Sequence, residues 1–188
     1  IRGGGTKDFY GGTLHGYKIN TVDYRGIVEY EPTELVITAR AGTPLAEIEA
    51  ALREKGQMLA FEPPHFDDLP SPLTPLPTGA GEGNVVPAKP AMRMATLGGC
   101  VAAGLSGPRR PYSGAVRDFV LGVRVLDGKG DDLRFGGQVM KNVAGYDVSR
   151  LMAGSLGTLG VLLEISLKVL PAPTAETTLH LECGPEQA

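Results

Sequence analysis

Glycine is the feature that most constrains how this chain can fold. It supplies 27 of the 188 residues, whereas an average chain contains about 7% glycine. Many of these glycines fall in three clusters, at residues 3–5, 98–107 and 154–160. Glycine permits positive-φ turns, and it lets successive backbone N–H groups converge on an anion without interference from a Cβ atom. The clusters therefore predict either phosphate-binding loops or tight turns and close packing, and the glycines alone leave both open.

The common phosphate-binding and hydrolytic motifs are missing. Residues 122–130 are spaced one residue too long for a Walker loop, and the lysine there is followed by glycine. Residues 154–160 run G-x-x-G-x-x-G into a predicted strand, whereas the NAD-binding fingerprint runs G-x-G-x-x-G into a helix. There is no H-E-x-x-H or G-x-S-x-G, and the three histidines are isolated. P-loop, classical NAD-binding, metalloprotease and hydrolase functions are therefore not supported.

The charge and composition of the chain exclude further classes of protein. The formal net charge is −3, with 18 basic and 21 acidic residues scattered along the chain, which indicates no nucleic-acid-binding face. No apolar run reaches the roughly 18 residues of a membrane span. Cys100 and Cys183 lack a second cysteine at metal-ligand spacing. We therefore expect a soluble, cytoplasmic protein without a metal site. Because it starts at Ile1 rather than Met, we expect a fragment.

The first third of the chain predicts strands followed by a helix. Short strands are expected at residues 17–22, 26–30 and 35–39. Thr43 and Pro44 predict a helix N-cap with proline at the first helical position. Apolar residues then recur on one stripe as far as Leu52, and Gly56 is placed as the C-terminal stop. A returning strand is expected at residues 57–61.

The second half of the chain predicts a further set of strands after an irregular insert. Eight of the 15 prolines fall within residues 62–90, a composition typical of an extended loop. A short helix is expected near Leu97. Strands are expected at residues 119–126, 132–135, 161–170 and 178–182, the first two joined by a hairpin turn at Asp127-Gly128-Lys129-Gly130.

Several segments, taken in order, resemble one known family. They are I-R-G-G-G-T-K (1–7), T-L-G-G (96–99), Y-S-G-x-V-R-D (112–118), G-Y-D (145–147) and G-S-L-G-T-L-G-V (154–161). Together they resemble the FAD-binding domain of the vanillyl-alcohol-oxidase (PCMH-type) flavoproteins over nearly the whole chain. Three stretches are similar to the E-type FAD-binding subunit of bacterial glycolate oxidase, namely E-P-P-H (62–65), G-P-R-R-P (107–111) and V-M-K-N-V-A-G-Y-D (139–147).

The resemblance implies an α+β fold of two lobes that clamp an extended FAD between them. The first lobe is expected at residues 1–61, the Pro/Gly-rich insert at 62–94, the second lobe at 95–171, and the start of a C-terminal region at 172–188. In relatives a separate cap domain completes the substrate pocket, and we expect that domain to be missing or truncated here.

The resemblance also implies a set of cofactor-binding residues. Those of the first loop would donate backbone N–H groups to the pyrophosphate, residues 96–99 would approach it from the second lobe, and the others would line the flavin, the ribityl chain and the rest of the dinucleotide. The set is Arg2, Gly3, Gly4, Gly5, Thr6, Lys7, Thr96, Gly98, Gly99, Gly104, Gly107, Ser113, Gly114, Gly157, Gly160 and Val161. Some relatives bind flavin covalently through a histidine that here is replaced by Thr6, so we expect non-covalent FAD.

The resemblance implies oxidation of a short 2-hydroxy acid such as glycolate to the 2-oxo acid. The flavin would accept a hydride, and electrons would pass to a partner iron-sulfur subunit in a complex that also holds a homologous flavin subunit. Arg109 or Arg110 could bind the substrate carboxylate, the alternative being solvated arginines or a subunit contact. His65 could act as a base, the alternative being an ordinary loop histidine. Partners would carry the complex to the inner membrane.

Two other functions stay open at this point. The chain could be an FAD-carrying or purely structural subunit, with oxidation taking place on a homologous partner, and the fragment alone could be inactive. It could also belong to another PCMH-type oxidoreductase, such as an NADPH-dependent reductase on the same flavin fold.

Overall fold

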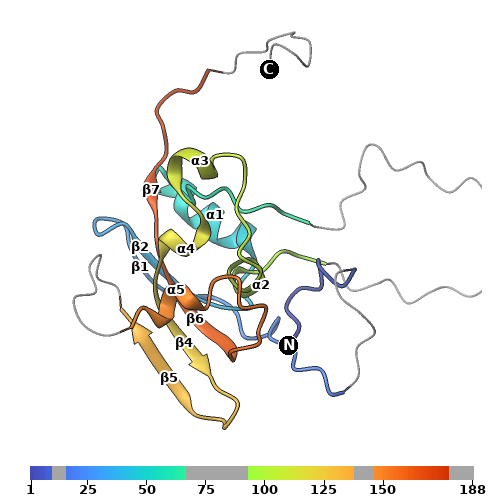
Figure 1. Ribbon diagram of the computed structural model, residues 1–188. Coiled ribbons are helices and arrows are strands. Elements are labelled where there is room, and N and C mark those ends of the chain that lie inside the picture. The colour runs from blue at the N-terminus through green and yellow to red at the C-terminus, as the bar shows by residue number, and fades with distance from the viewer. Residues whose placement is uncertain (10–15, 67–92, 138–145, 178–188) are drawn as a thin grey trace, which may run out of the picture.

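The structure is a computed structural model that describes residues 1–9, 16–66, 93–137 and 146–177. Five strands form one antiparallel sheet in the order β1-β2-β6-β4-β5 (Figure 1). Their bounds are β1 Ile27–Glu31, β2 Val36–Arg40, β4 Val120–Leu126, β5 Asp132–Gly136 and β6 Val161–Lys168. A separate two-stranded ladder joins β3 (Gln57–Met58) to β7 (Leu170–Pro171).

The central strands form where the sequence is most continuously apolar. Ile165 and Leu167 of β6 are fully buried, and Ser166 between them turns to the other face, where its hydroxyl lies 2.8 Å from that of Thr38. This alternation is that of a strand with one face on the core. Strand β4 is buried at most positions because it lies between β6 and β5.

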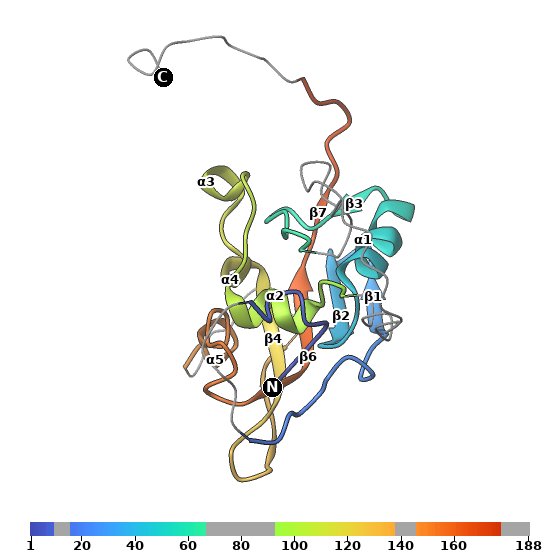
Figure 2. The same ribbon diagram turned by 90° about the vertical axis from the view of Figure 1, so that its right-hand side faces the viewer.

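Five helices complete the described fold. They are α1 Leu45–Glu54, α2 Leu97–Ala103, α3 Arg110–Ser113, α4 Val116–Phe119 and α5 Val148–Leu151. Helix α1 buries Leu45, Ile48 and Leu52 completely, and each such side chain contributes roughly 1.5–3 kcal/mol through removal from water. Figure 2 shows α2 crossing in front of the strands, and it contacts β2 and β6.

The two predicted lobes share one sheet and one core. Strand β2, from the range 1–61, pairs along its whole length with β6, from the range 95–171. The buried core residues of both ranges form a single cluster, in which the rings of Phe61 and Phe119 lie 5.5 Å apart. The lobes are therefore not independent folding units in the described part of the chain, because each supplies strands that the other needs.

Several local predictions are confirmed. The predicted β2, β4, β5 and β6, the helix near Leu97 and the stop at Gly56 all appear, although β6 ends at Lys168. The helix stop has the expected left-handed backbone, with φ of 64° at Gly56. The turn after β4 also forms as predicted, because the Asp127 carboxylate accepts hydrogen bonds from the backbone N–H groups of Lys129 and Asp131.

Other local predictions were wrong. Thr43 is not the N-cap of α1, because Pro44 takes that position and the Thr43 hydroxyl bonds instead to the backbone of Gly26. Residues 17–22 form no strand beyond one bridge between Asn20 and Arg2. The strand predicted at 57–61 has only two residues. The strand predicted at 178–182 and most of the insert lie outside the described residues.

Candidate functional site

The glycine loop (residues 3–7) lies against the N-terminus of α2 (Figure 2). A Cβ atom on Gly3 would lie 2.7 Å from the Thr96 hydroxyl oxygen, and one on Gly4 would overlap the carbonyl oxygen of Met94. Real Cβ atoms almost never lie closer than 3.0 Å to another heavy atom, so a side chain at either position would force its neighbour to move. The loop therefore needs glycine because it packs directly on the segment that leads into α2.

The N-terminus of α2 is fixed in place beside that of α1. The hydroxyl of Thr96, the N-cap residue, accepts a hydrogen bond from the Gly99 N–H at 3.3 Å. Backbone bonds join Leu45 to Ala95 and Leu97 to Thr43, both at 2.9 Å. Two helix starts thus lie side by side. The first N–H groups of α2 are already bonded within the chain, those of Leu97 and Gly98 to backbone carbonyls and that of Gly99 to the Thr96 hydroxyl, so these bonds hold the two helix starts together.

Lys7 adds a full positive charge at this point. Its Nζ lies 3.4 Å from the Thr6 hydroxyl, 6.0 Å from the centre of the Phe66 ring and 3.7 Å from where a Gly99 Cβ would be. Within the described parts of the chain, no carboxylate pairs with it. Partial burial lowers the pKa of Lys7, because it removes water from around the ammonium.

Other cations surround the same loop. Arg2 begins it, and Lys18 and Arg93 lie close enough to help lower the pKa of the Asp8 carboxylate. Asp8 is the acidic residue among them. Among the described residues, a chain of net charge −3 thus places several cations close to one loop, and such a cluster attracts anions.

A second group of predicted residues lies at the other end of α2. Gly104 ends the helix with φ of 67°, and the Gly107 N–H donates to the Phe61 carbonyl at 2.8 Å. The Ser113 hydroxyl donates to the Ala60 carbonyl at 2.7 Å, and Gly114 follows with φ of 101°. The two groups of predicted residues therefore lie toward opposite ends of α2. A ligand that contacts both groups must be longer than a single phosphate.

The third glycine cluster has a mixed role. The loop at 154–157 bonds to the last turn of α2, and Gly157 packs on Ile1 beside the glycine loop. Gly160 packs on Val125 and Leu126 within the sheet, and Val161 is buried. Gly98 likewise packs on Ala41. Close packing, the alternative that the glycines left open, accounts for Gly98 and Gly160.

Comparisons with known proteins agree with this geometry. A family model described as "FAD binding domain" matches residues 1–69. The glycolate oxidase subunit GlcE of Escherichia coli strain K12 is 53% identical over all 188 residues, which cover 47% of that protein. Residues 1–69 thus match the FAD-binding domain family. Its cofactor is FAD.

Other relatives share parts of this FAD-binding domain. The glycolate oxidase subunit GlcD of Bacillus subtilis strain 168 is 42% identical over 47% of this chain and 19% of its own length. The D-lactate dehydrogenase of Anaerostipes hadrus is 39% identical over 52% of this chain and 21% of its own. A solved alkyldihydroxyacetonephosphate synthase shares the fold, with a TM-score of 0.55, 22% identity and coverage of 81% and 22%. The chain thus spans about half or less of these relatives.

Two of the three candidate catalytic residues, Arg109 and His65, are engaged with other side chains. The Arg109 guanidinium donates to Glu62 at 3.0 Å and to Glu176 at 2.6 Å, so these two side chains would compete with a substrate carboxylate for it. His65 Nε2 lies 3.1 Å from the Glu49 carboxylate. Arg110 is exposed.

The sequence missed three residues of the site. Met94 contributes a carbonyl, Phe66 a ring and Asp8 a carboxylate. Only Asp8 carries a sequence signal, since it directly follows the loop. Lys141 and Asn142 lie outside the described residues. The residues described contain no group of His, Cys, Asp and Glu placed to hold a metal, and no described helix is long and apolar enough for a membrane span.

Proposed function

We propose that this chain is the FAD-binding part of a subunit of a glycolate-oxidising complex, which converts glycolate or a similar 2-hydroxy acid to the 2-oxo acid. The observation that carries the proposal is the Lys7 ammonium at the junction of the glycine loop and α2, with which no carboxylate of the described residues pairs. A diphosphate needs a cation and backbone N–H donors, which Lys7 and the glycine loop would supply. The identity to the glycolate oxidase subunit GlcE supports the substrate class.

FAD fits the residues that are present. The glycine loop would hold the diphosphate through its backbone N–H groups and Lys7, with Thr96 and Gly99 beside it, because close packing of Gly3 and Gly4 on Thr96 and Met94 keeps the loop at the start of α2. Gly107, Ser113 and Gly114 would lie toward the flavin. Gly104, Gly157, Gly160 and Val161 would support the path between them. FAD, held non-covalently, would supply the hydride-accepting chemistry.

The remaining roles follow from the charges. Arg110 would bind the substrate carboxylate, because Arg109 is held by Glu62 and Glu176. Electrons would pass to a partner iron-sulfur subunit beside a homologous flavin subunit. We place the complex in the cytoplasm, with partners holding it at the inner membrane.

A flavin-carrying subunit without turnover of its own is the second candidate. Arg109 and His65, two of the three candidate catalytic residues, are engaged with carboxylates, and this observation favours it. The two functions separate in the purified complex. Gly4→Asp and Gly99→Asp in this subunit should abolish its visible flavin absorption and glycolate oxidation together.

The outcomes are distinct. Glycolate oxidation that persists after this subunit loses its flavin would support the second candidate, a subunit without turnover of its own. Full flavin content in the variants would overturn FAD binding at this junction. Acid precipitation of the wild-type complex should release the colour, as expected for non-covalent FAD. Bleaching of the flavin by NADPH and none by glycolate would point to a reductase instead.

A further inference from the structure

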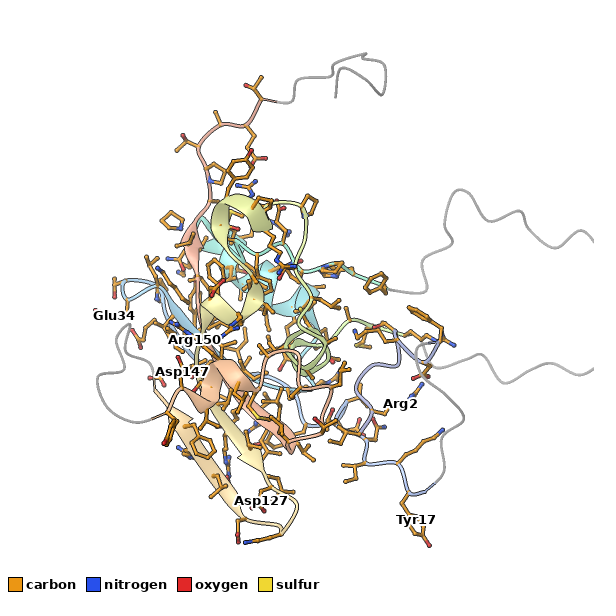
Figure 3. The ribbon with its side chains drawn as sticks, in the orientation of Figure 1. Arg2, Tyr17, Glu34, Asp127, Asp147 and Arg150 are labelled. Carbon is orange, nitrogen blue, oxygen red and sulfur yellow. The ribbon has the colours of Figure 1, made fainter. Side chains whose placement is uncertain are left out.

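Arg2 and Asp8 flank the glycine loop and join its two ends. The Asp8 carboxylate accepts hydrogen bonds from Arg2 Nε at 3.1 Å and from Arg2 Nη2 at 2.6 Å. This two-point geometry is the strongest form of an ion pair between these groups. Both side chains are just over one-third exposed. Figure 3 labels Arg2 on the N-terminal segment.

The two ends of the loop are held differently. At the first end, the backbone of Arg2 bonds to residues 19–21, through the Ile19 carbonyl at 2.8 Å and the Thr21 N–H at 2.9 Å. At the second end, the Asp8 N–H donates to the Gly5 carbonyl at 3.2 Å, and its carboxylate is held by Arg2. The Arg2 backbone is thus fixed to residues 19–21, and its side chain in turn fixes Asp8 at the second end of the loop.

The Arg2 side chain also passes close to the turn of the loop. Gly5 has φ of 78°, and a Cβ atom there would overlap Nη2 of Arg2. The guanidinium therefore packs on the backbone of the loop while it bonds to Asp8. The turn at Gly5, the guanidinium and the carboxylate form one unit.

We propose that the Arg2–Asp8 ion pair holds the glycine loop in the shape that binds the cofactor's diphosphate, so that Asp8 is a positioning residue for FAD. This inference rests on the proposed function. A loop fixed before binding loses less conformational freedom on binding, and its affinity rises accordingly. Arg2 lowers the pKa of Asp8, so the carboxylate is ionised at neutral pH.

The negative charge of Asp8 allows its positioning role to be distinguished from a direct electrostatic effect on the phosphates. Asp8 is an anion beside a site for an anion, so its charge alone opposes the phosphates. Removal of that charge would then tighten FAD binding, the more so because Arg2 would lose the carboxylate with which it pairs. If Asp8 positions the loop, the same substitution weakens FAD binding. The direction of the change alone therefore decides between the two.

The test uses the full-length protein stripped of flavin and titrated with FAD. Asp8→Asn should weaken FAD binding by roughly three- to tenfold, the size expected for one charge-assisted pair. The matched control is Asp23→Asn, which removes an exposed acidic side chain. Asp8→Glu should recover part of the lost affinity. The thermal midpoint of the flavin-free Asp8→Asn protein should match that of the control.

A double-mutant cycle completes the test. Arg2→Gln should weaken binding as much as Asp8→Asn, and the double variant should be no weaker than either single one, because both remove the same pair. Unchanged or tighter binding in Asp8→Asn, or additive losses in the double variant, would overturn the proposal while FAD binding stood. Absence of FAD binding by the wild-type protein would overturn the proposed function, and this inference with it.

Discussion

At the scale of single residues, Lys7 carries a charge that its described surroundings do not neutralise. The ammonium donates one long hydrogen bond to the Thr6 hydroxyl and lies over the Phe66 ring, and neither group carries a negative charge. Burial of the ammonium costs hydration free energy, and the lowered pKa of Lys7 reflects this cost. A bound diphosphate would relieve it, so affinity for FAD and the charge of Lys7 are coupled.

Lys7→Met should weaken FAD binding by about 10- to 100-fold, the size expected when a charged hydrogen-bonding group is lost. The wild-type protein should also lose affinity as the pH rises through the pKa of Lys7, because only the ammonium attracts phosphate. Since burial lowers that pKa, the loss should begin below the ordinary lysine value of about 10.4. FAD titrations from neutral to alkaline pH check both points, and the variant should show no such step.

Gly4→Ala should destabilise the loop and abolish tight FAD binding, because the added Cβ would overlap the Met94 carbonyl. The expected cost is about 1–3 kcal/mol of stability, as for other overpacked sites. Gly128→Ala is the matched control, since an added Cβ there meets nothing within 4 Å. Equal flavin content in the two purified variants would contradict the close approach of the loop to α2.

At the scale of elements, α2 connects the two groups of cofactor residues. It is short, and its first turn depends on the Thr96 hydroxyl that caps Gly99. Because most short helices owe their stability to packing and caps, this hydroxyl helps to fix the first turn of α2 beside the glycine loop.

Thr96→Ala should therefore cost about 1 kcal/mol of stability and weaken FAD binding, whereas Thr96→Ser, which keeps the hydroxyl, should retain both. Chemical denaturation and FAD titration of the two variants give the comparison. Equal stability of the two would show that the cap is dispensable.

The elements also show how far the sequence can be read. Strands β2, β4 and β6 were predictable because their apolar patterns are continuous or alternate strictly. The length of β3 was overestimated. Only two residues pair with β7, and two residues are too few to give a recognisable apolar pattern. Thr43 was assigned to a cap that it does not make, because its hydroxyl found a distant partner at Gly26.

The candidate site was less predictable than the fold. The glycine loop and Thr96 were identified by resemblance, and the structure places them together. The ion pairs of Arg109 with Glu62 and Glu176 join residues far apart in the chain, and no local pattern encodes such a contact. Asp8 was missed because its role depends on the direction of one side chain.

At the scale of the whole molecule, one sheet unites the two predicted lobes. Ile165 of β6 is fully buried where β6 pairs with both β2 and β4. A cavity there should weaken contacts of both ranges together, because they share one hydrophobic cluster.

Ile165→Ala should cost about 2–5 kcal/mol and lower the amide-exchange protection of β2 and β4 by similar factors. Leu133→Ala, on the partly exposed edge strand β5, should have a much smaller effect. Hydrogen exchange measured strand by strand makes the comparison. Loss of protection in β4 alone would indicate two lobes that unfold independently.

The pairing of β2 with β6 also affects how the chain is made. Strand β2 leaves the ribosome early, but its partner lies more than a hundred residues later. Until β6 emerges, one edge of an apolar strand has no neighbour, and such edges pair readily with other chains. Loop closure over this length also makes folding slow. We therefore expect the nascent chain to depend on chaperones until residue 168 has been synthesised and released from the exit tunnel.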